Sequence, residues 1–322
     1  MGIGKVNTLG ADSIAKINTL AKASISKISS IAKASINKVS SVVASFAAAF
    51  TNNRAVSKSI TTGSGNAITI AETNHFSFTQ SDAFSIGFWI KVGWNNSLNT
   101  NIHFFAMNDG SSTARNEQIR IFYNESNNRL EFRIGSDSSN RSLQFWALHS
   151  NLTQTGLAGS ATSQYWSSAT TANRGNVNGD NFTHIMITKG TGTTLAASNV
   201  EAYWNGNKFN SAFYASGNNT GTPNMDGEAN RRIALGSNAH NLDKSGNNNA
   251  TVYNDLTIYN KQLSDAEVTA LYNSGTPTDA TALSSAGNLR GYYTFENSDG
   301  TDSSGTEGPT FTVNGDSSIV SV

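Results

Sequence analysis

Acidic side chains within strand-like stretches are the residues of this chain best suited to catalysis. Cleavage of a glycosidic bond with retention needs two carboxyl groups about 5 Å apart, which usually come from acids close together on one strand. No Glu-x-Asp-x-Glu or comparable cluster occurs in the sequence. Glu131, Glu201 and Glu296 each stand alone among strand-like residues. We therefore expect all three side chains to face solvent, and the chain to be non-enzymatic.

Other kinds of reactive site lack their motifs. The five histidines show no His-x-His or His-x-x-x-His spacing of the kind that binds a metal ion. The sequence has no cysteine, which excludes disulfides, thiolate zinc sites and thiol catalysis. It also has no Gly-Lys-Ser or Gly-Lys-Thr phosphate loop. Nucleotide and thiol chemistry are therefore not expected.

Aromatic residues in a long polar stretch are the candidates for sugar binding. A sugar presents an apolar face and hydroxyl groups, so its site needs an exposed ring beside polar side chains. Residues 137–180 form a long insertion between predicted strands, and long loops in compact domains tend to be functional or disordered. Trp166 has an alternative role, because it could pack inside a small cluster of the insertion itself. The predicted ligand-binding residues are Trp146, Tyr165 and Trp166.

The elements that must position these side chains have the pattern of short strands. After a polar linker at 51–57, apolar residues alternate in runs separated by Gly, Asn, Ser and Asp. Between Trp204 and Lys208 an Asn-Gly pair separates two such runs, which is a strong hairpin signal. The pattern predicts an all-β, two-layer antiparallel sandwich at 58–275. A further β segment at 276–322 is expected to pack on the sandwich or to extend it.

One short helix is predicted near residues 264–273. Ser264 and Glu267 have the spacing of a capping box, in which each side chain binds the other residue's backbone amide. Gly275 is expected to end the helix. We expect one helix face to dock on the sandwich, formed by Val268, Leu271 and Tyr272.

The segment 251–275, TVYNDLTIYNKQLSDAEVTALYNSG, resembles the strand and short helix near the end of concanavalin A-like, laminin-G-like jelly rolls. The resemblance covers roughly residues 56–275, and 288–305 resembles a module that often accompanies this domain in bacterial and phage proteins. The resemblance of 56–275 implies a jelly-roll sandwich and a structural role for His184. Three earlier segments of the chain also support this resemblance and occur in the expected order: 84–91, 184–189 with 200–208, and 233–237.

The same resemblance implies where a calcium ion would bind. Family members often hold calcium at the rim of the sandwich through Asp side chains and backbone carbonyls, in line with its preference for oxygen ligands. The matching candidates here are Asp180 with Asn181, and Asp243 in the loop 238–249. The alternative is that these Asn-rich loops are simply turns. We expect no cofactor, with calcium at these residues as the alternative.

Residues 2–45 form a repeat within an N-terminal arm, 1–50. Four consecutive blocks of eleven residues each carry apolar residues at their second, fifth and eighth positions, and lysine at the fourth. This period, about 3.67 residues per turn, keeps one stripe along a helix with a right-handed supercoil. Because β-branched residues and glycines disfavour a helix, an extended or solenoid-like segment is the alternative. The predicted assembly-anchor residues are Ile14, Lys16, Ile17, Leu20, Ile25, Lys27, Ile28, Ile31, Ile36, Lys38 and Val39.

Charge divides the chain in the same way. Residues 1–58 hold eight Lys and Arg residues against one Asp, a formal charge of +7, and the remainder carries −7. The lysine row is either a solvated face or a strip that meets an acidic shell protein or nucleic acid. Nucleic acid is not expected, because the arm has no aromatic residue before Phe46 and no arginine before Arg54.

The arm also resembles the repeated Ile-x-Lys-Val-Asn segments of predicted phage structural proteins. Together the two resemblances imply a virion protein, a capsid decoration or a fibre, which is assembled in the host cytoplasm and displays its sandwich to surface glycans. The arm would bind other virion proteins, and its unburied stripe favours a homo-oligomer such as a trimer. No membrane partner is expected, since no stretch approaches the roughly 20 apolar residues of a spanning helix. The alternatives are a bacterial surface lectin or adhesin and, third, a glycanase of the concanavalin A-like fold.

Overall fold

The computed structural model describes a set of separate ranges within the body of the chain. They are 52–58, 68–73, 75–79, 81–93, 102–108, 117–124, 129–134, 143–148, 182–192, 199–208, 214–216, 231–237, 250–296, 299–313 and 317–321. The chain divides into two compact units, Met1–Ala49 and Phe50–Val322. The arm lies outside the described residues, and so do all eleven predicted anchor residues from Ile14 to Val39.

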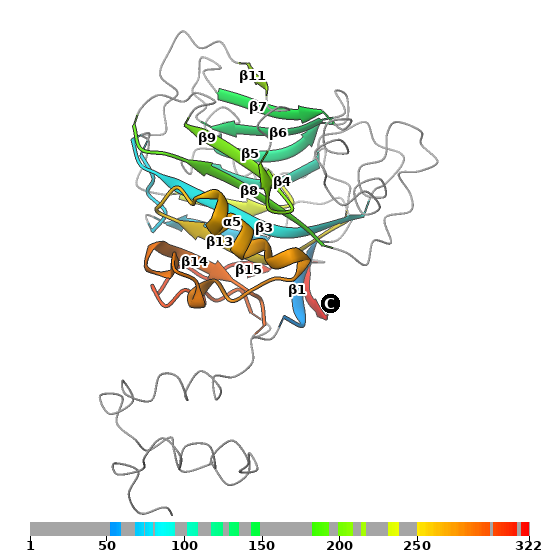
Figure 1. Ribbon diagram of the computed structural model, residues 1–322. Helices are drawn as coiled ribbons and strands as arrows, with labels where there is room; N and C mark the ends of the chain where they lie inside the picture. Colours follow the sequence, from blue (N-terminus) through cyan, green and yellow to red (C-terminus); the bar gives the residue numbers. More distant parts are fainter. Residues whose placement is uncertain are drawn as a thin grey trace, which may run out of the picture. The chain divides into compact units, whose positions relative to one another are not determined.

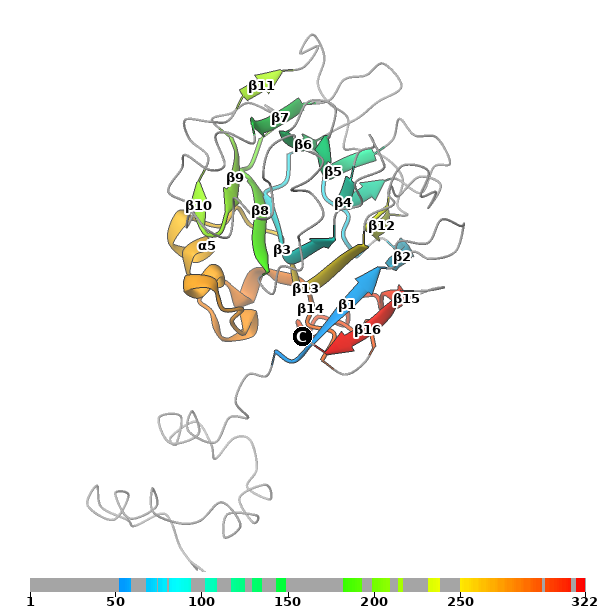
Figure 2. The same cartoon turned by 90° about the vertical axis from the view of Figure 1, so that its right-hand side faces the viewer.

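The body consists of two antiparallel sheets, which confirms the predicted all-β sandwich (Figures 1 and 2). In sheet A the strand order is β10 (Asn207–Lys208), β9 (Val200–Trp204), β8 (Thr183–Lys189), β3 (Phe84–Gly93), β13 (Ala250–Tyr259), β1 (Arg54–Lys58) and β16 (Ser318–Ser321), and β14 (Leu289–Tyr293) also pairs with β13. In sheet B it is β11 (Tyr214–Ser216), β7 (Leu143–Leu148), β6 (Arg129–Ile134), β5 (Glu117–Asn124), β4 (Ile102–Asn108), β12 (Arg231–Leu235), β2 (Ile68–Thr73) and β15 (Thr312–Val313).

The main core lies between the two sheets and follows from strand alternation. Successive side chains of a strand point to opposite faces, so every second residue of β3, from Phe84 to Ile90, enters this core. Across the layers, Phe88 of β3 stacks on Phe105 of β4 with ring centroids 6.3 Å apart. Burying each such side chain contributes roughly 1.5–3 kcal/mol. The alternation therefore leaves a second, outward face on each sheet.

The first strand starts inside the predicted linker, so the linker at 51–57 is too long. Strand β1 begins at Arg54, and Ala55 and Val56 are fully buried. Its partners are β13 and β16, about 200 and 265 residues away in sequence, and no local signal could have indicated them. The predicted C-terminal β segment extends both sheets, because β14 and β16 join sheet A and β15 joins sheet B.

The one α-helix, α5 (Asp265–Tyr272), forms where the sequence predicts it. The Glu267 amide donates to Ser264 Oγ at 3.4 Å, and the Ser264 amide donates to the Glu267 carboxylate at 2.9 Å, so the capping box is confirmed. The helix ends at Asn273, in the left-handed region at φ 42°, and not at Gly275. Asparagine tolerates this conformation better than most residues, so the stop comes two residues early.

Helix α5 covers part of the outward face of sheet A. Val268 and Leu271 are buried, as predicted, and Tyr272 stacks on Trp89 of β3 with ring centroids 5.7 Å apart. The 3-10 turns Asn273–Gly275, Ala280–Ala282 and Ala286–Asn288 follow. Within the described ranges, neither α5 nor any of these turns has the length and apolar character of a membrane-spanning helix. A second core on this face comprises Met186, Tyr203, Tyr259, Leu263, Val268, Leu271, Ala280, Leu289 and Tyr292.

Candidate functional site

Most of the predicted ligand residues lie outside the described ranges. Trp146 lies in β7, where its backbone is paired in register with Glu131 of β6 on one side and Tyr214 of β11 on the other. The residues outside the described ranges are Tyr165, Trp166, Asp180, Asn181 and Asp243. Among the residues that the structure describes, no group of three or more His, Asp or Glu side chains is arranged to hold a metal ion.

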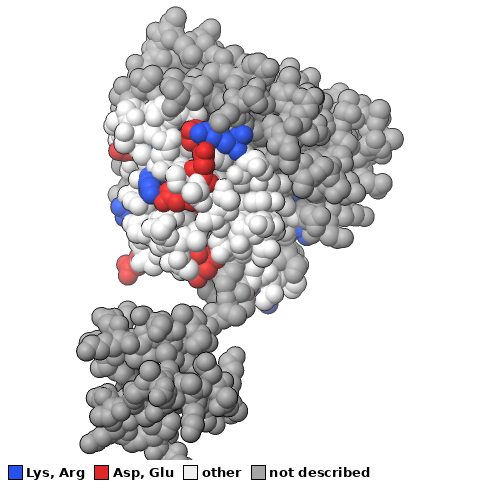
Figure 3. Space-filling model, viewed as in Figure 1, with Lys and Arg blue, Asp and Glu red and all other residues white. Residues whose placement is uncertain are grey.

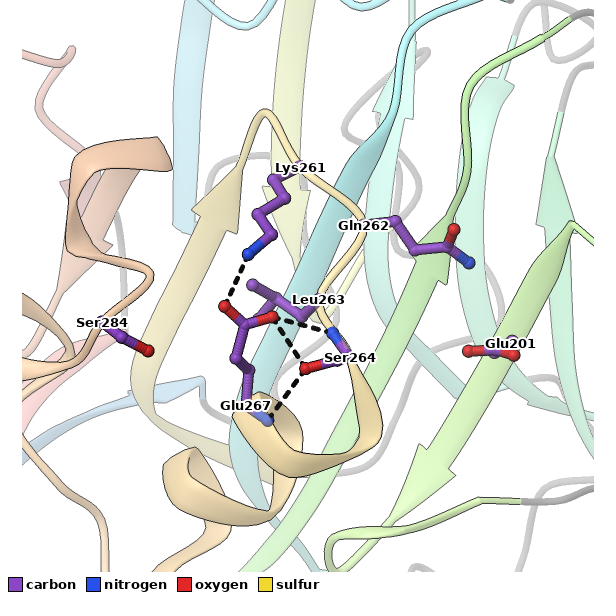
Figure 4. A pocket seen from close by; sticks show the side chains of 7 residues that line it. All are labelled: Glu201, Lys261, Gln262, Leu263, Ser264, Glu267 and Ser284. Carbon is purple, nitrogen blue, oxygen red and sulfur yellow. Dashed lines mark hydrogen bonds and ion pairs between the residues drawn. The ribbon is translucent and has the colours of Figure 1, made fainter.

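A pocket of about 630 Å³ lies where strand β9 faces the start of helix α5 (Figure 4). Its residues come from β9, the link between β13 and α5, the first turn of α5, and the segment between two 3-10 turns. In Figure 4 the Gln262 amide extends toward the side of Glu201, and Ser284 points toward Glu267 from the opposite side. The lining residues are Glu201, Lys261, Gln262, Leu263, Ser264, Glu267 and Ser284.

The link between β13 and α5 is fixed to the sheet by one buried hydroxyl. Ser85 Oγ of β3 donates to the Lys261 carbonyl at 2.7 Å and accepts the Leu263 amide at 2.9 Å. Leu263 itself is fully buried in the second core. These contacts attach the pocket wall to the sheet, and attachment of this kind favours a preorganised site.

The carboxylate on the helix side of the pocket, Glu267, accepts three hydrogen bonds. Lys261 Nζ lies 2.6 Å from Glu267 Oε1, and the Ser264 hydroxyl and amide each lie 2.9 Å from Glu267 Oε2. Burial alone would raise the pKa of Glu267, but Lys261 and Ser264 outweigh it and lower that pKa below its ordinary value. Glu267 is therefore a hydrogen-bond acceptor at neutral pH and not a proton donor.

The carboxylate on the strand side, Glu201, belongs to a second network. The buried Tyr203 hydroxyl lies 2.8 Å from Glu201 Oε2 and 2.6 Å from Asp265 Oδ1. Lys208 Nζ pairs with Glu201 and lies 3.5 Å from Asp265 Oδ1. Burial and the two carboxylates raise the pKa of Tyr203 well above its ordinary value, so the phenol stays protonated. The prediction that Glu201 faces solvent is therefore incomplete, because its side chain is bound to Tyr203 and Lys208.

Charged groups of both signs gather around α5 on the described part of this face, and the surface around them is largely uncharged (Figure 3). Each pocket carboxylate pairs with a lysine, Glu267 with Lys261 and Glu201 with Lys208, which it shares with Asp265. Among the described residues, the side chains of Gln262 and Ser284 make no hydrogen bond. The pocket therefore offers amide and hydroxyl groups beside carboxylates that are each paired with a lysine.

Glu201 and Asp265 form the close carboxylate pair that a glycanase would need, because both contact one hydroxyl oxygen. In a glycosidase, however, the two carboxyl groups flank the bond that is cleaved. Asp265 does not line the pocket, and Tyr203 and Lys208 lie between the two acids and hold them. This arrangement suits a structural network better than a catalytic pair.

The other two acids that the sequence places in solvent are also engaged. Glu131 is fully buried on the outward face of sheet B, with Arg133 Nη2 3.1 Å from its Oε2. Glu296 accepts the backbone amides of Asn53 and Arg54 at 2.7 and 2.8 Å. Strand alternation alone does not reveal which outward faces are covered, so the prediction of solvent exposure is wrong for Glu131 and incomplete for Glu296.

Two buried titratable groups lie in sheet A, away from the pocket wall. The ring of His184 in β8 packs at a tilt against Trp89 with ring centroids 5.1 Å apart, and burial lowers the pKa of His184 to about 3. Asp255 lies at a bulge in β13 with φ 45° and accepts hydrogen bonds from Tyr292 and Asn52 at 2.7 and 2.6 Å. Burial raises the pKa of Asp255 to about 7 despite these two bonds.

No family model and no curated protein matches this chain. Among solved structures, it is similar to a proposed carbohydrate binding protein from Bacteroides ovatus ATCC 8483, with TM-score 0.46 and 12% identity over 85% of this chain and 61% of that one. It is also similar to the binding domain of botulinum neurotoxin serotype G, with TM-score 0.37 and 14% identity over 60% and 36% of the two chains.

A third similar structure is the binding domain of Paraclostridial Mosquitocidal Protein 1, with TM-score 0.37 and 19% identity over 61% of this chain and 38% of that one. The match thus spans 36% to 61% of the lengths of these three chains. With TM-scores below 0.5, these likenesses carry no functional argument, and the function of the chain has to be inferred from its own residues.

Proposed function

We propose that this chain is a non-enzymatic phage virion protein, a capsid decoration or a fibre, whose β-sandwich binds glycans. The observation that carries the glycan part is the composition of the pocket between β9 and α5. Its free groups are the Gln262 amide and the Ser284 hydroxyl, beside the acceptor oxygens of Glu201 and Glu267. Planar amides and carboxylates together with hydroxyls are suited to the vicinal hydroxyl groups of a sugar.

The pairing of both pocket carboxylates with lysines favours a neutral sugar. Lysines compensate both carboxylates, so an ionic ligand would find no unmatched partner among the described lining residues. A volume of about 630 Å³ falls within the usual range of small-molecule sites, about 300–1,000 Å³. The rigid link through Ser85 limits the entropy lost when a sugar binds.

A binding experiment with the full chain tests the glycan part. Gln262→Ala and Ser284→Ala remove side chains that make no hydrogen bond among the described residues, so both variants should fold normally. We expect each to weaken binding of a neutral glycan selected on an array by roughly ten-fold, the value of one or two hydrogen bonds. Ser303→Ala, outside the pocket, is the matched control. Unchanged affinity in both pocket variants would contradict this site.

The non-enzymatic part is tested with the same glycan. Incubation should release no new reducing ends, because Glu201 and Asp265 are held by Tyr203 and Lys208 and do not flank a common space. Hydrolysis that is abolished by Glu201→Gln would instead establish the chain as a glycanase.

The virion part is supported by the eleven-residue basic repeat of residues 2–45. A stripe of this kind needs partners, which other virion proteins or a trimer of arms would provide. Deleting residues 2–45 should leave a soluble, folded body that no longer joins particles assembled in the host cytoplasm. Normal incorporation of the truncated chain would refute the anchor. Recovery of the native protein from bacterial surfaces and not from purified virions would favour the lectin or adhesin.

A further inference from the structure

The outward face of sheet B holds two arginines directly opposite each other. Strands β5 and β6 pair in a register that places Arg120 against Arg133 and Phe122 against Glu131. Ile121 and Phe132, which alternate with these positions, are buried in the main core, so the four residues belong to the opposite face. Like charges directly opposite in a sheet are destabilising. The pairing of Arg120 with Arg133 must therefore be stabilised by neighbouring groups or be retained for a function.

One aromatic ring, Phe122, contacts both guanidinium groups. The guanidinium carbons of Arg120 and Arg133 lie 4.2 and 4.8 Å from the Phe122 ring centroid. His103 of β4 stacks on the same ring at 5.8 Å, and its Nε2 lies 3.3 Å from Arg120 Nη2. Cation–π contacts of this kind are worth about 0.5–2 kcal/mol each. Phe122 thus contacts the guanidinium groups of two arginines that are cross-strand neighbours.

The two arginines reach the surface, whereas the groups that hold them do not. Phe122 and Glu131 are fully buried, while 31% of the Arg133 side chain is exposed and Arg120 is half-buried. Arg133 uses one Nη2 for Glu131, and a guanidinium has five N–H donors in a planar fork. Donors held in a plane at a partly exposed surface match a carboxylate better than a point cation does.

We infer that Arg120 and Arg133 form a second binding site on the outward face of sheet B, for a carboxylate-bearing saccharide. This inference rests on the proposed function, that the sandwich binds glycans, and gives it an acidic ligand class at a site separate from the α5 pocket. The backbone of Trp146 adjoins Glu131 in register, so one of the aromatic residues nominated by the sequence is next to this site along the sheet. The carboxylate would bind the two guanidinium groups, and the sugar would extend toward β7.

Binding of matched acidic and neutral saccharides by the full chain tests the site. The probes are sialyllactose against lactose, and trigalacturonate against its methyl ester, at low and high salt. We expect the acidic members to bind roughly ten-fold more tightly or better, the value of charge-assisted hydrogen bonds, with a preference that falls as salt rises. Equal affinity within both pairs would overturn the inference.

Variants separate this site from the neutral pocket. Arg133→Gln should remove the acidic preference, and Arg133→Lys should restore it only in part, because a lysine lacks the planar fork. Arg290→Gln, an exposed arginine of sheet A, is the charge-matched control. If Arg133→Gln fails to fold because Glu131 loses its partner, the double variant Glu131→Gln/Arg133→Gln removes both charges together and replaces it.

The outcomes also separate the two proposals. Loss of acidic binding in Arg133→Gln, with neutral-glycan binding kept, supports the second site. Acidic binding that survives in Arg133→Gln or in the double variant overturns it and leaves the α5 pocket standing. Binding of no saccharide, acidic or neutral, overturns both proposals.

Discussion

The outward faces of the two sheets differ in how their charged side chains are arranged. On sheet A, Glu201, Asp265 and Lys208 close a network around the Tyr203 hydroxyl, and helix α5 completes it. On sheet B, Arg120 and Arg133 lie side by side over one aromatic ring. On the first face, lysines pair with the acids that line the pocket. The second has arranged two cations of the same sign at its surface.

The two faces also differ in what pH can change. Sheet A contains His184 and Asp255, both with strongly shifted pKa values, whereas an arginine in a protein does not lose its proton. The comparison therefore predicts that pH acts on stability through His184 and Asp255 of sheet A, while the two arginines of sheet B keep their charge.

The largest expected effect comes from His184. Its pKa falls from 6.5 to about 3 on folding because the ring is buried. The contribution of His184 to stability is therefore present above pH 6.5 and is lost as pH falls toward 3. In this range the imidazole is protonated in the unfolded chain but stays neutral in the folded chain. The loss should reach about 5 kcal/mol. His184→Phe keeps a planar ring beside Trp89 and should remove this slope in urea unfolding between pH 7 and 4. The same slope in the variant would contradict the assignment.

Asp255 should have the opposite effect on stability, because its contribution is lost as pH rises. Burial raises its pKa from 3.8 to about 7, with Glu296 and Asp279 adding like charge, while Tyr292 and Asn52 lower it. Its contribution is full below pH 3.8 and is lost as pH rises through 7, at a cost of about 4 kcal/mol. Asp255→Asn tolerates the same left-handed backbone and carries no charge. The variant should match the wild type near pH 4 and exceed it in stability at pH 8, as measured by urea unfolding.

Disrupting the Tyr203 network on sheet A should also lower the free energy of unfolding. Tyr203→Phe removes the one hydroxyl that contacts both Glu201 and Asp265, and should lower the free energy of unfolding by about 1–3 kcal/mol. Tyr259→Phe is a matched control, because Tyr259 is buried in the same second core without lying between two acids. Equal losses in the two variants would show that the Tyr203 network adds nothing beyond burial.

The features that could be predicted from the sequence are those that depend on residues close together in the chain. Helix α5 followed from Ser264 and Glu267, three positions apart, and the hairpin followed from the Asn205–Gly206 pair, whose φ values of 48° and 74° are both left-handed. The strands followed from alternation. These features depend on local backbone chemistry, so no knowledge of the tertiary structure was needed.

Partners distant in sequence could not be predicted. Tyr203 and Asp265 are 62 residues apart, and strand β1 finds its neighbours only near the end of the chain. The burial of Glu131 depends on what covers the outward face of sheet B, which a period of two along one strand does not encode. The pocket was missed for the same reason, since its residues come from separate segments between 201 and 284.

The smallest expected effect tests whether the two arginines and Phe122 form one unit. Phe122→Leu keeps much of the apolar volume but removes the ring quadrupole that attracts both guanidinium groups. It should cost about 1 kcal/mol in addition to the lost burial, and part of that cost should disappear when Arg120 is already absent. A double-mutant cycle of Phe122→Leu and Arg120→Gln should therefore give a coupling energy of about 0.5–1 kcal/mol in urea unfolding. Because the cycle cancels the loss of apolar volume, which is common to both backgrounds, a coupling energy near zero would mean that the ring and the cation are neighbours without being partners. The arginines of sheet B would then owe their positions to other contacts, and the contrast between the two faces would lie in exposure alone.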